Sequence, residues 1–280
     1  MHYISPFEKL REEYGDSLFD SNTINLDNIV SFKNVLEELI GVYKKKEVNF
    51  IRNKTVALNS PRLLKGILEY NIKNNVHKPE IILNKGIDLC LKLYCDKDDE
   101  ENLESLLQFQ NEVIENYDLY NLIIREKFDF ISWEATNSLK SISSANFLKK
   151  KLDEKNGPLL FIGLANGGIA PGLDVFLNYC SQSNCLEESI FYTTRFSTRK
   201  KKDKEPCLKD SEIEYLYDSS FDKSGIVIFD EDISSGRTIL EAKKYFTDIF
   251  SNENIVILSN QISNFTKQLN PKFYKSYFEL

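Results

Sequence analysis

The stretch GIVIFDEDISSGRT, residues 225–238, decides how the rest of this chain is interpreted. Its four apolar residues at 226–229 have the length and the branched side chains of a fully buried strand. Two carboxylates and a Ser-Ser-Gly loop follow that strand. A helix is predicted after the loop, because apolar residues recur there at three- and four-residue spacing: Ile239, Ala242, Phe246, Ile249 and Phe250. The predicted order is strand, acidic pair, short loop and helix.

This order suits a phosphorylated sugar. The free backbone N–H groups and the dipole at the start of a helix attract a phosphate, and Gly236 lets the backbone approach it closely. Asp230 and Glu231 would lie beside the phosphate, where they can accept hydrogen bonds from sugar hydroxyls or help to hold a metal ion. The same residues also fit a plainer structure, a parallel strand that ends in solvated acids before a capped helix.

Two further apolar runs, Leu159–Leu164 and Ile255–Leu258, read as buried strands of the same type. The first ends in Ala-Asn-Gly-Gly and is followed by Pro171, which suits the first turn of a helix. Alternating strands and helices with glycine-bearing loops indicate a parallel α/β sheet, whose site lies outside the carboxyl ends of its strands.

At residues 225–238 the chain resembles the ribophosphate-binding motif of the type I phosphoribosyltransferases, in which a hydrophobic strand leads into two acidic residues and a Thr/Ser-Gly turn. The run from Ile233 to Thr238 is similar to the purine-salvage branch. The resemblance covers about residues 129–262. It implies a parallel-sheet phosphoribosyltransferase-like core, 5-phosphoribosyl pyrophosphate or a nucleotide as ligand, Mg²⁺ as cofactor, and formation or reversal of a ribosyl–nitrogen bond on a nucleobase or related acceptor.

The resemblance also implies roles for individual residues. Asp230 and Glu231 would hold the ribose hydroxyls and Mg²⁺, and with Asp232 they form the implied catalytic set. The basic loop after the segment 189–195 has the guanidinium and hydroxyl groups that bind pyrophosphate. The implied ligand-binding residues are Ser234, Ser235, Gly236, Arg237, Thr238, Asn166, Gly167, Gly168, Arg195, Ser197, Thr198, Arg199 and Lys200.

Two positions depart from the family pattern. Ser234 stands where purine-salvage enzymes carry an aspartate that handles the proton of the base, and a serine does not do this at neutral pH. Asn166 stands where a basic residue is frequent. Asp232 occupies a position that is usually apolar in the family, so it either is structural or replaces the missing base-handling acid.

Composition bounds the class of protein. The chain has 280 residues, of which 41% are hydrophobic and 28% charged, and its formal net charge is −7. These values are typical of a globular protein and argue against general nucleic-acid binding. No apolar run has the length of a membrane span, so we expect no membrane association and a cytoplasmic location. Five cysteines predict free thiols, and two histidines leave little material for Ser-His-Asp or His-metal chemistry.

Residues 1–128 are expected to form a mainly helical domain, and residues 129–280 the phosphoribosyltransferase-like domain. One amphipathic helical face is predicted from Ile29, Phe32, Leu36, Leu39 and Ile40. Val48–Ile51 and Thr55–Leu58 are candidate short strands. Trp133 is expected to pack a helix on the sheet. The role of the first domain stays open, with a protein partner or a homodimer surface as candidates.

Three hypotheses for function remain from the sequence. The first is a phosphoribosyltransferase or a related enzyme. The second is a non-catalytic module of the same fold that binds a ribose phosphate or nucleotide and reports it to a partner. The third is an effector of a bacterial conflict system that alters nucleotides.

Overall fold

The computed structural model describes ten segments of the chain, residues 3–14, 27–47, 49–96, 98–127, 130–152, 157–165, 167–196, 206–251, 254–263 and 271–278. The chain divides into two compact units, one formed by Tyr3–Trp133 and the other containing Glu134–Leu280. The division lies a few residues after the boundary expected from the sequence. One short helix, α8 (Phe130–Ala135), crosses it.

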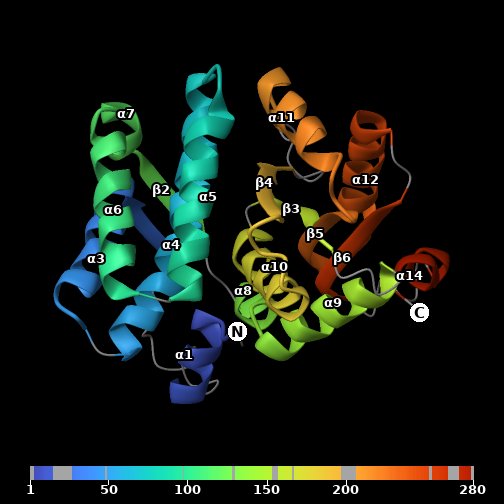
Figure 1. The fold of residues 1–280 in the computed structure, drawn as a ribbon, viewed down its shortest axis with the longest axis horizontal. Coiled ribbons are helices and arrows are strands. Elements are labelled where there is room, and N and C mark those ends of the chain that lie inside the picture. Colours follow the sequence, from blue (N-terminus) through green and yellow to red (C-terminus); the bar gives the residue numbers. More distant parts are fainter. Residues whose placement is uncertain are drawn as a thin grey trace. The chain divides into compact units, whose positions relative to one another are not determined.

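The first unit is mainly helical (Figure 1). A two-stranded antiparallel sheet, β1 with β2, joins residues that are far apart in the sequence and pairs Asp27 with Lys127 and Ser31 with Ile123. The elements of this unit are α1 (Pro6–Tyr14), β1 (Asp27–Ser31), α3 (Phe32–Lys44), α4 (Asn49–Asn74), α5 (Pro79–Cys95), α6 (Asp99–Ile114), α7 (Tyr117–Tyr120) and β2 (Ile123–Lys127).

Three expectations for this unit were wrong. Ile29 is not part of the amphipathic helix face but lies in β1, where 69% of its surface is exposed. The helix α3 begins only at Phe32, because Ser31 caps it by accepting a hydrogen bond from the Asn34 N–H. Thr55–Leu58, a candidate strand, lies inside α4. Of the other candidate strand, Val48–Ile51, residues 49–51 form the start of α4, and Val48 lies outside the described residues. Tertiary packing of α4 outweighs the strand preference of these residues.

Helix α4 continues through Pro61, which lacks the N–H that would bond to the carbonyl of Ala57. The hydroxyl of Tyr94, on α5, donates to that Ala57 carbonyl at 3.3 Å. Beside it, the Cys90 thiol donates to the Ser60 carbonyl at 3.1 Å. Side chains of a neighbouring helix therefore satisfy backbone groups around the proline, and α4 passes through a residue that ordinarily breaks helices.

The second unit is an α/β fold with a four-stranded, all-parallel sheet in the order β4-β3-β5-β6. Its elements are α9 (Ser138–Lys151), β3 (Leu159–Ala165), α10 (Ile169–Ser183), β4 (Ile190–Arg195), α11 (Asp210–Ser220), β5 (Gly225–Ile233), α12 (Arg237–Phe250), β6 (Ile255–Ile262) and α14 (Pro271–Phe278). The alternation of strands and helices predicted from the sequence is confirmed at this level.

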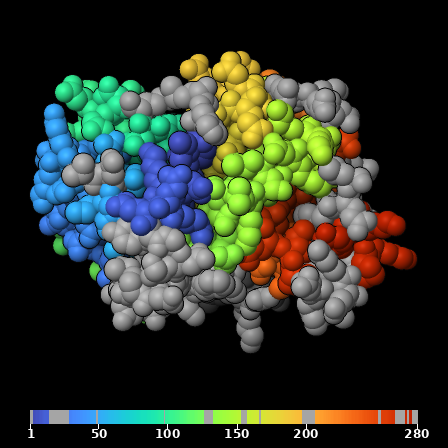
Figure 2. Space-filling view, turned by 90° about the horizontal axis from the view of Figure 1, so that it is seen from below, coloured from blue at the N-terminus to red at the C-terminus, as the bar shows by residue number. Residues whose placement is uncertain are grey.

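Helices cover both faces of the sheet (Figure 1). On one face α9 and α10 lie side by side (Figure 2), and on the other α12 packs on β5 and β6 with α11 next to it. This placement follows from right-handed crossovers, because the connection from β3 to β4 runs in the opposite direction to those from β4 to β5 and from β5 to β6. Four of the five residues predicted for the apolar stripe of α12 are buried, namely Ile239, Ala242, Phe246 and Phe250, whereas Ile249 is only half-buried.

The core under α10 is aromatic. Phe161 and Phe191 are stacked with ring centroids 5.7 Å apart, and Phe176 meets both rings edge-on. Phe229 closes the cluster at 5.7 Å from Phe161. Full burial of each ring contributes about 1.5–3 kcal/mol. This cluster fixes α10 on the sheet, and with it the loop that enters the helix.

Trp133 does not pack on the sheet, which corrects the expectation from the sequence. Its indole is buried against α1, where Phe7 meets it edge-on at 6.3 Å and the Arg11 guanidinium lies 3.8 Å over the ring. Arg11 also donates to the Trp133 carbonyl. The only tryptophan therefore anchors the first helix of the first unit.

Candidate functional site

The candidate site lies between β3 and β5, two neighbouring strands whose following helices pack on opposite faces of the sheet. After β3 the chain enters α10 on one face, whereas after β5 it enters α12 on the other. The strand order 2-1-3-4, counted along the second unit, places this switch between β3 and β5. In open parallel sheets such a point leaves a crevice outside the carboxyl ends of the strands, where ligands bind.

The acidic residues lie within β5 and not beyond its end, which corrects the shorter strand predicted from the sequence. Beside β3, β5 stays paired only as far as Phe229, opposite Gly163. Beside β6 it continues, pairing Asp230 with Ser259 and Asp232 with Gln261. The acids thus lie on a stretch of β5 that is no longer paired with β3, although β3 itself continues beside β4 to Ala165, and that is paired with β6 alone. This leaves the β3 side of Asp230–Asp232 for the loop that follows β3.

Glu231 meets that loop directly. A methyl group placed on Gly167 would overlap the carboxylate of Glu231, so the missing side chain of Gly167 is what makes room for the acid. Gly168 turns the chain tightly: its N–H donates to the Leu164 carbonyl at 3.0 Å, and its own carbonyl accepts from Gly172. The structure therefore brings together two stretches that the sequence singled out separately, at Gly167 and at Glu231, which are 64 positions apart (231 − 167).

The two neighbouring acids interact directly with each other. Phe229 contacts Gly172 of α10, and beyond it the side chains of Asp230 and Glu231 interact with each other. Burial, followed by the negative charge of Glu231, raises the pKa of Asp230 well above its usual value. The Glu231 N–H donates to Asp230 Oδ1 at 3.1 Å and opposes this shift. The pair favours a cation or hydroxyl donors nearby.

The Ser/Gly loop gives α12 an open start. Gly236, at φ 77°, has the left-handed conformation that favours glycine, and it offers no side chain to cap the helix. Ser263 ties the loop to the end of β6, donating through its N–H to the Ile233 carbonyl and through its hydroxyl to the Ser234 carbonyl. Ser235 Oγ accepts from the Arg237 N–H at a long 3.4 Å.

Arg237 and Thr238, two of the predicted ligand-binding residues at the start of α12, differ in how exposed their side chains are. The Arg237 guanidinium is paired with Glu241 one turn along α12, at 2.7 Å, and is largely exposed. Thr238 is half-buried in the first turn. The structure therefore gives Arg237 an ion-pair partner on the helix surface, while its backbone N–H stays part of the helix start.

Arg195 ends β4 at the same edge of the sheet. Its carbonyl accepts a hydrogen bond from the Cys207 N–H at 3.0 Å, so the two ends of the basic loop are joined at its base. The predicted residues Asn166, Ser197, Thr198, Arg199 and Lys200 lie outside the described residues.

Sequence reasoning missed a polar network at the end of β6. Asn260 donates to the Ala135 carbonyl at 2.7 Å and to Ser141 Oγ at 3.1 Å, and it accepts from Ser144 Oγ at 2.8 Å. Ser259 Oγ donates to the Glu231 carbonyl at 3.3 Å. The network joins the α8–α9 turn to β6 and, through Ser259, to the acidic stretch of β5. The Ser-Asn-Gln run after an apolar strand was the one signal that could have indicated it.

The acidic pair fits a hard divalent cation in one respect. Carboxylate oxygens that repel each other are the ligands Mg²⁺ takes, and Mg²⁺ is commonly held by one or two carboxylates together with phosphate oxygens of a substrate. Among the described residues no group of three or more His, Cys, Asp or Glu side chains is arranged to hold a metal ion.

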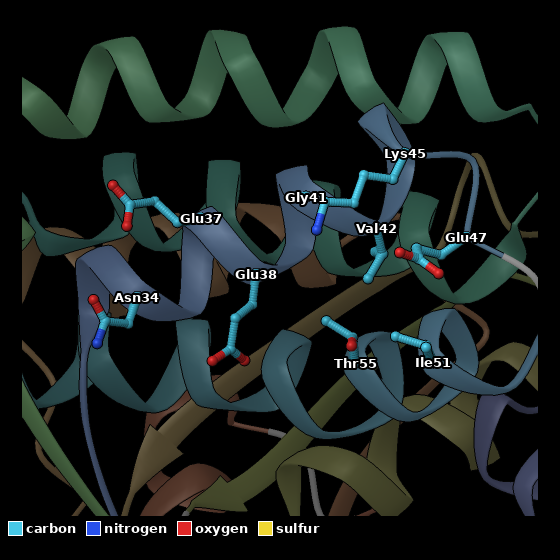
Figure 3. A pocket seen from close by; sticks show the side chains of 9 residues that line it. All are labelled: Asn34, Glu37, Glu38, Gly41, Val42, Lys45, Glu47, Ile51 and Thr55. Atoms are coloured by element: carbon cyan, nitrogen blue, oxygen red, sulfur yellow. The ribbon is translucent and has the colours of Figure 1, made fainter.

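The first unit contains two polar cavities of its own. One, of about 410 Å³, lies between α3 and the first turns of α4, and its lining is drawn in Figure 3. Glu38 in this cavity accepts a hydrogen bond from Asn59 Nδ2 at 2.7 Å. The other, of about 400 Å³, includes Arg52, which is paired with Asp96 and Asp99. Both are distant in sequence from the predicted site residues.

Comparison with known proteins adds no assignment to this geometry. Scans against protein-family models, the curated proteins and the solved structures found no match for the chain. Among its described helices, none has both the length and the apolar character needed to cross a membrane.

Proposed function

We propose that the second unit binds a ribose phosphate at the switch point between β3 and β5, and that the protein is a phosphoribosyltransferase-like enzyme using 5-phosphoribosyl pyrophosphate and Mg²⁺. The observation that carries the proposal is the contact of Glu231 with Gly167, next to the open start of α12. It joins an acidic pair, a glycine turn and the backbone N–H groups of a helix start within one edge of a parallel sheet.

The proposed roles follow from the chemistry of each group. The N–H groups of the first turn of α12, with the hydroxyls of Ser234, Ser235 and Thr238, would bind the 5′-phosphate. Asp230 and Glu231 would accept hydrogen bonds from the ribose hydroxyls. Gly167 and Gly168 would let the backbone approach the pyrophosphate closely.

The reaction would be a displacement at the anomeric carbon. A nitrogen nucleophile forms the new bond while pyrophosphate leaves with the electron pair of the C–O bond, and the ribose ring becomes cationic between the two events. The carboxylates of Asp230 and Glu231 would stabilise the positive ring, and holding both reactants in line would lower the barrier. When bound, Mg²⁺ would neutralise charge on the pyrophosphate, with Asp230 and Glu231 as the residues to hold it.

A second function has one observation in its favour. Ser234 lacks the carboxyl group that would handle the proton of a purine base, and the half-buried Asp232 is the only acid of the motif not otherwise assigned. Without a base-handling acid the same pocket would bind a ribose phosphate or nucleotide and transmit its presence to a partner at the helical unit. Both functions imply a cytoplasmic location, where thiols are kept reduced, and the five cysteines are free thiols.

The two functions separate in one assay. The protein is incubated with 5-phosphoribosyl pyrophosphate, Mg²⁺ and a panel of nucleobases, and release of pyrophosphate is followed. Release that depends on one base, and that is lost with Asp230→Asn plus Glu231→Gln while the circular dichroism spectrum persists, supports the enzyme. Calorimetric binding with no release on any base supports the module. No binding of 5-phosphoribosyl pyrophosphate or ribose 5-phosphate refutes both.

A further inference from the structure

Two cysteines meet at the end of α10. The helix ends at Ser183, and Asn184 takes the left-handed conformation with φ 51° and ψ 42°. The Cys185 N–H then donates to the Cys180 carbonyl at 3.3 Å, which is the six-to-one bond of a Schellman motif. This motif brings the side chains of its two end residues into contact, and here the two thiols are hydrogen-bonded to each other.

The surroundings of Cys185 favour its thiolate. Hydrogen bonds from Cys180 and from Ser189, whose hydroxyl donates at 3.4 Å, lower the pKa of Cys185 to about 7 against the opposing effects of burial and of the Glu188 charge. Cys185 is buried but is the more exposed of the two, at 6% against 1% for Cys180. Cys90 offers the contrast: it is 0% exposed and burial raises its pKa, so it is the unreactive thiol of the chain.

We propose that Cys180 and Cys185 are an oxidisable thiol pair, in which Cys185 reacts with a hydroperoxide and Cys180 converts the product into a disulfide. In the first step the Cys185 thiolate attacks a peroxide oxygen, the O–O bond breaks, and the departing hydroxide takes up a proton. In the second, the Cys180 sulfur attacks the resulting sulfenic acid, the S–O bond breaks, and hydroxide leaves as water with the Cys180 proton. Two thiols are oxidised and hydrogen peroxide is reduced to water.

The pair is separate from the candidate site. Ser189 Oγ, which contacts Cys185, also accepts from the Leu159 N–H at the beginning of β3, so the pair lies at the amino edge of the sheet. The ribose-phosphate proposal concerns the carboxyl edge. The thiol proposal therefore stands or fails independently of it.

The chain provides a convenient test. Trypsin releases residues 156–195 as one peptide, since no Lys or Arg lies between Lys155 and Arg195, and this peptide holds Cys180 and Cys185 and no other cysteine. The native protein is treated with hydrogen peroxide, and its remaining thiols are blocked with iodoacetamide in denaturant. The protein is then digested without reduction, and the peptide masses are measured by mass spectrometry. We expect the peptide to lose two hydrogen atoms and to carry no alkyl group. A peptide alkylated on both cysteines overturns the proposal.

Variants assign the two roles. In Cys180→Ser, with Cys180→Ala as the substitute if it does not fold, Cys185 should stop at the sulfenic acid and be captured once by dimedone. A folded variant that gives no adduct under conditions that oxidise the wild type overturns the assignment of Cys185. The double variant Cys95→Ser, Cys207→Ser should form the disulfide at the wild-type rate, and loss of the disulfide there would show that it arises by exchange with those thiols. In the unoxidised protein Cys185 should be alkylated at least about tenfold faster than Cys90.

Discussion

Gly167→Ala tests the contact on which the candidate site is built. The added methyl would overlap the carboxylate of Glu231, and that carboxylate must move away from the switch point. The backbone itself accepts alanine, because Gly236 and not Gly167 is the glycine with positive φ among the described residues. The substitution therefore displaces one acid without straining the loop that carries it.

The size of the effect follows from the interaction lost. A hydrogen bond to a charged group contributes about 1.5–3 kcal/mol. If Glu231 accepts such a bond from a ribose hydroxyl, Gly167→Ala should lower the affinity for ribose 5-phosphate roughly 10- to 150-fold, since each 1.4 kcal/mol is about tenfold. The free energy of unfolding should change by less than about 1 kcal/mol, because the loop position is near the surface.

The assay is isothermal titration with ribose 5-phosphate and with 5-phosphoribosyl pyrophosphate, accompanied by urea unfolding. Gly41→Ala is the matched control, since a methyl there meets nothing within 4 Å. It should leave binding unchanged and stabilise α3 by about 0.5–1 kcal/mol. Glu231→Asp combined with Gly167→Ala should recover part of the affinity, because the shorter acid leaves space for the methyl.

The reasoning fails if Gly167→Ala binds both ligands as the wild type does. It also fails if the double variant binds no better than Gly167→Ala alone. In the first case Glu231 does not contact the ligand. In the second, the loss comes from the loop and not from the displaced acid.

Three further changes test other parts of the unit. Asp230 has a raised pKa in the folded protein, so its contribution to stability is present below about pH 4, its unfolded pKa, and is lost as the pH rises through the folded pKa. Asp230→Asn should therefore flatten the decrease in the free energy of urea unfolding with rising pH. An unchanged pH profile would contradict the raised pKa. Gly236→Ala forces φ 77° on a side chain and should cost about 1–2 kcal/mol in thermal unfolding; no loss would mean that the loop relaxes. Asn260→Ala removes three side-chain hydrogen bonds and should cost about 1–3 kcal/mol in urea unfolding, whereas a change within error would show that the network is replaced by water.

Local patterns in the sequence determined much of the second unit. Short apolar runs such as Leu159–Leu164 can only be buried on both faces, so they read as strands of a covered parallel sheet. The stripe on α12 follows from helical spacing, and its observed burial agrees with it. These features depend on neighbouring residues alone, which is why a single sequence contains them.

Features that depend on contacts with residues far away in the sequence could not be predicted from the sequence. Thr55–Leu58 has the branched residues of a strand, yet it is helical, because α4 packs on its neighbours and Tyr94 of α5 satisfies the carbonyl that Pro61 leaves without a donor. Trp133 packs against α1 and not on the sheet, since Phe7 and Arg11 approach it from over a hundred residues away. Local propensity is weaker than such packing.

For the candidate site, the sequence by itself determined the chemistry: two acids, a Ser/Gly turn and a helix start in that order. The tertiary structure alone decided their arrangement. It extended β5 along β6 past the end of its pairing with β3, placed Glu231 against Gly167, and raised the pKa of Asp230. The physical reason is that pairing register, close approach and burial are properties of strands brought side by side, and a linear pattern specifies residue types without specifying which distant residues become neighbours.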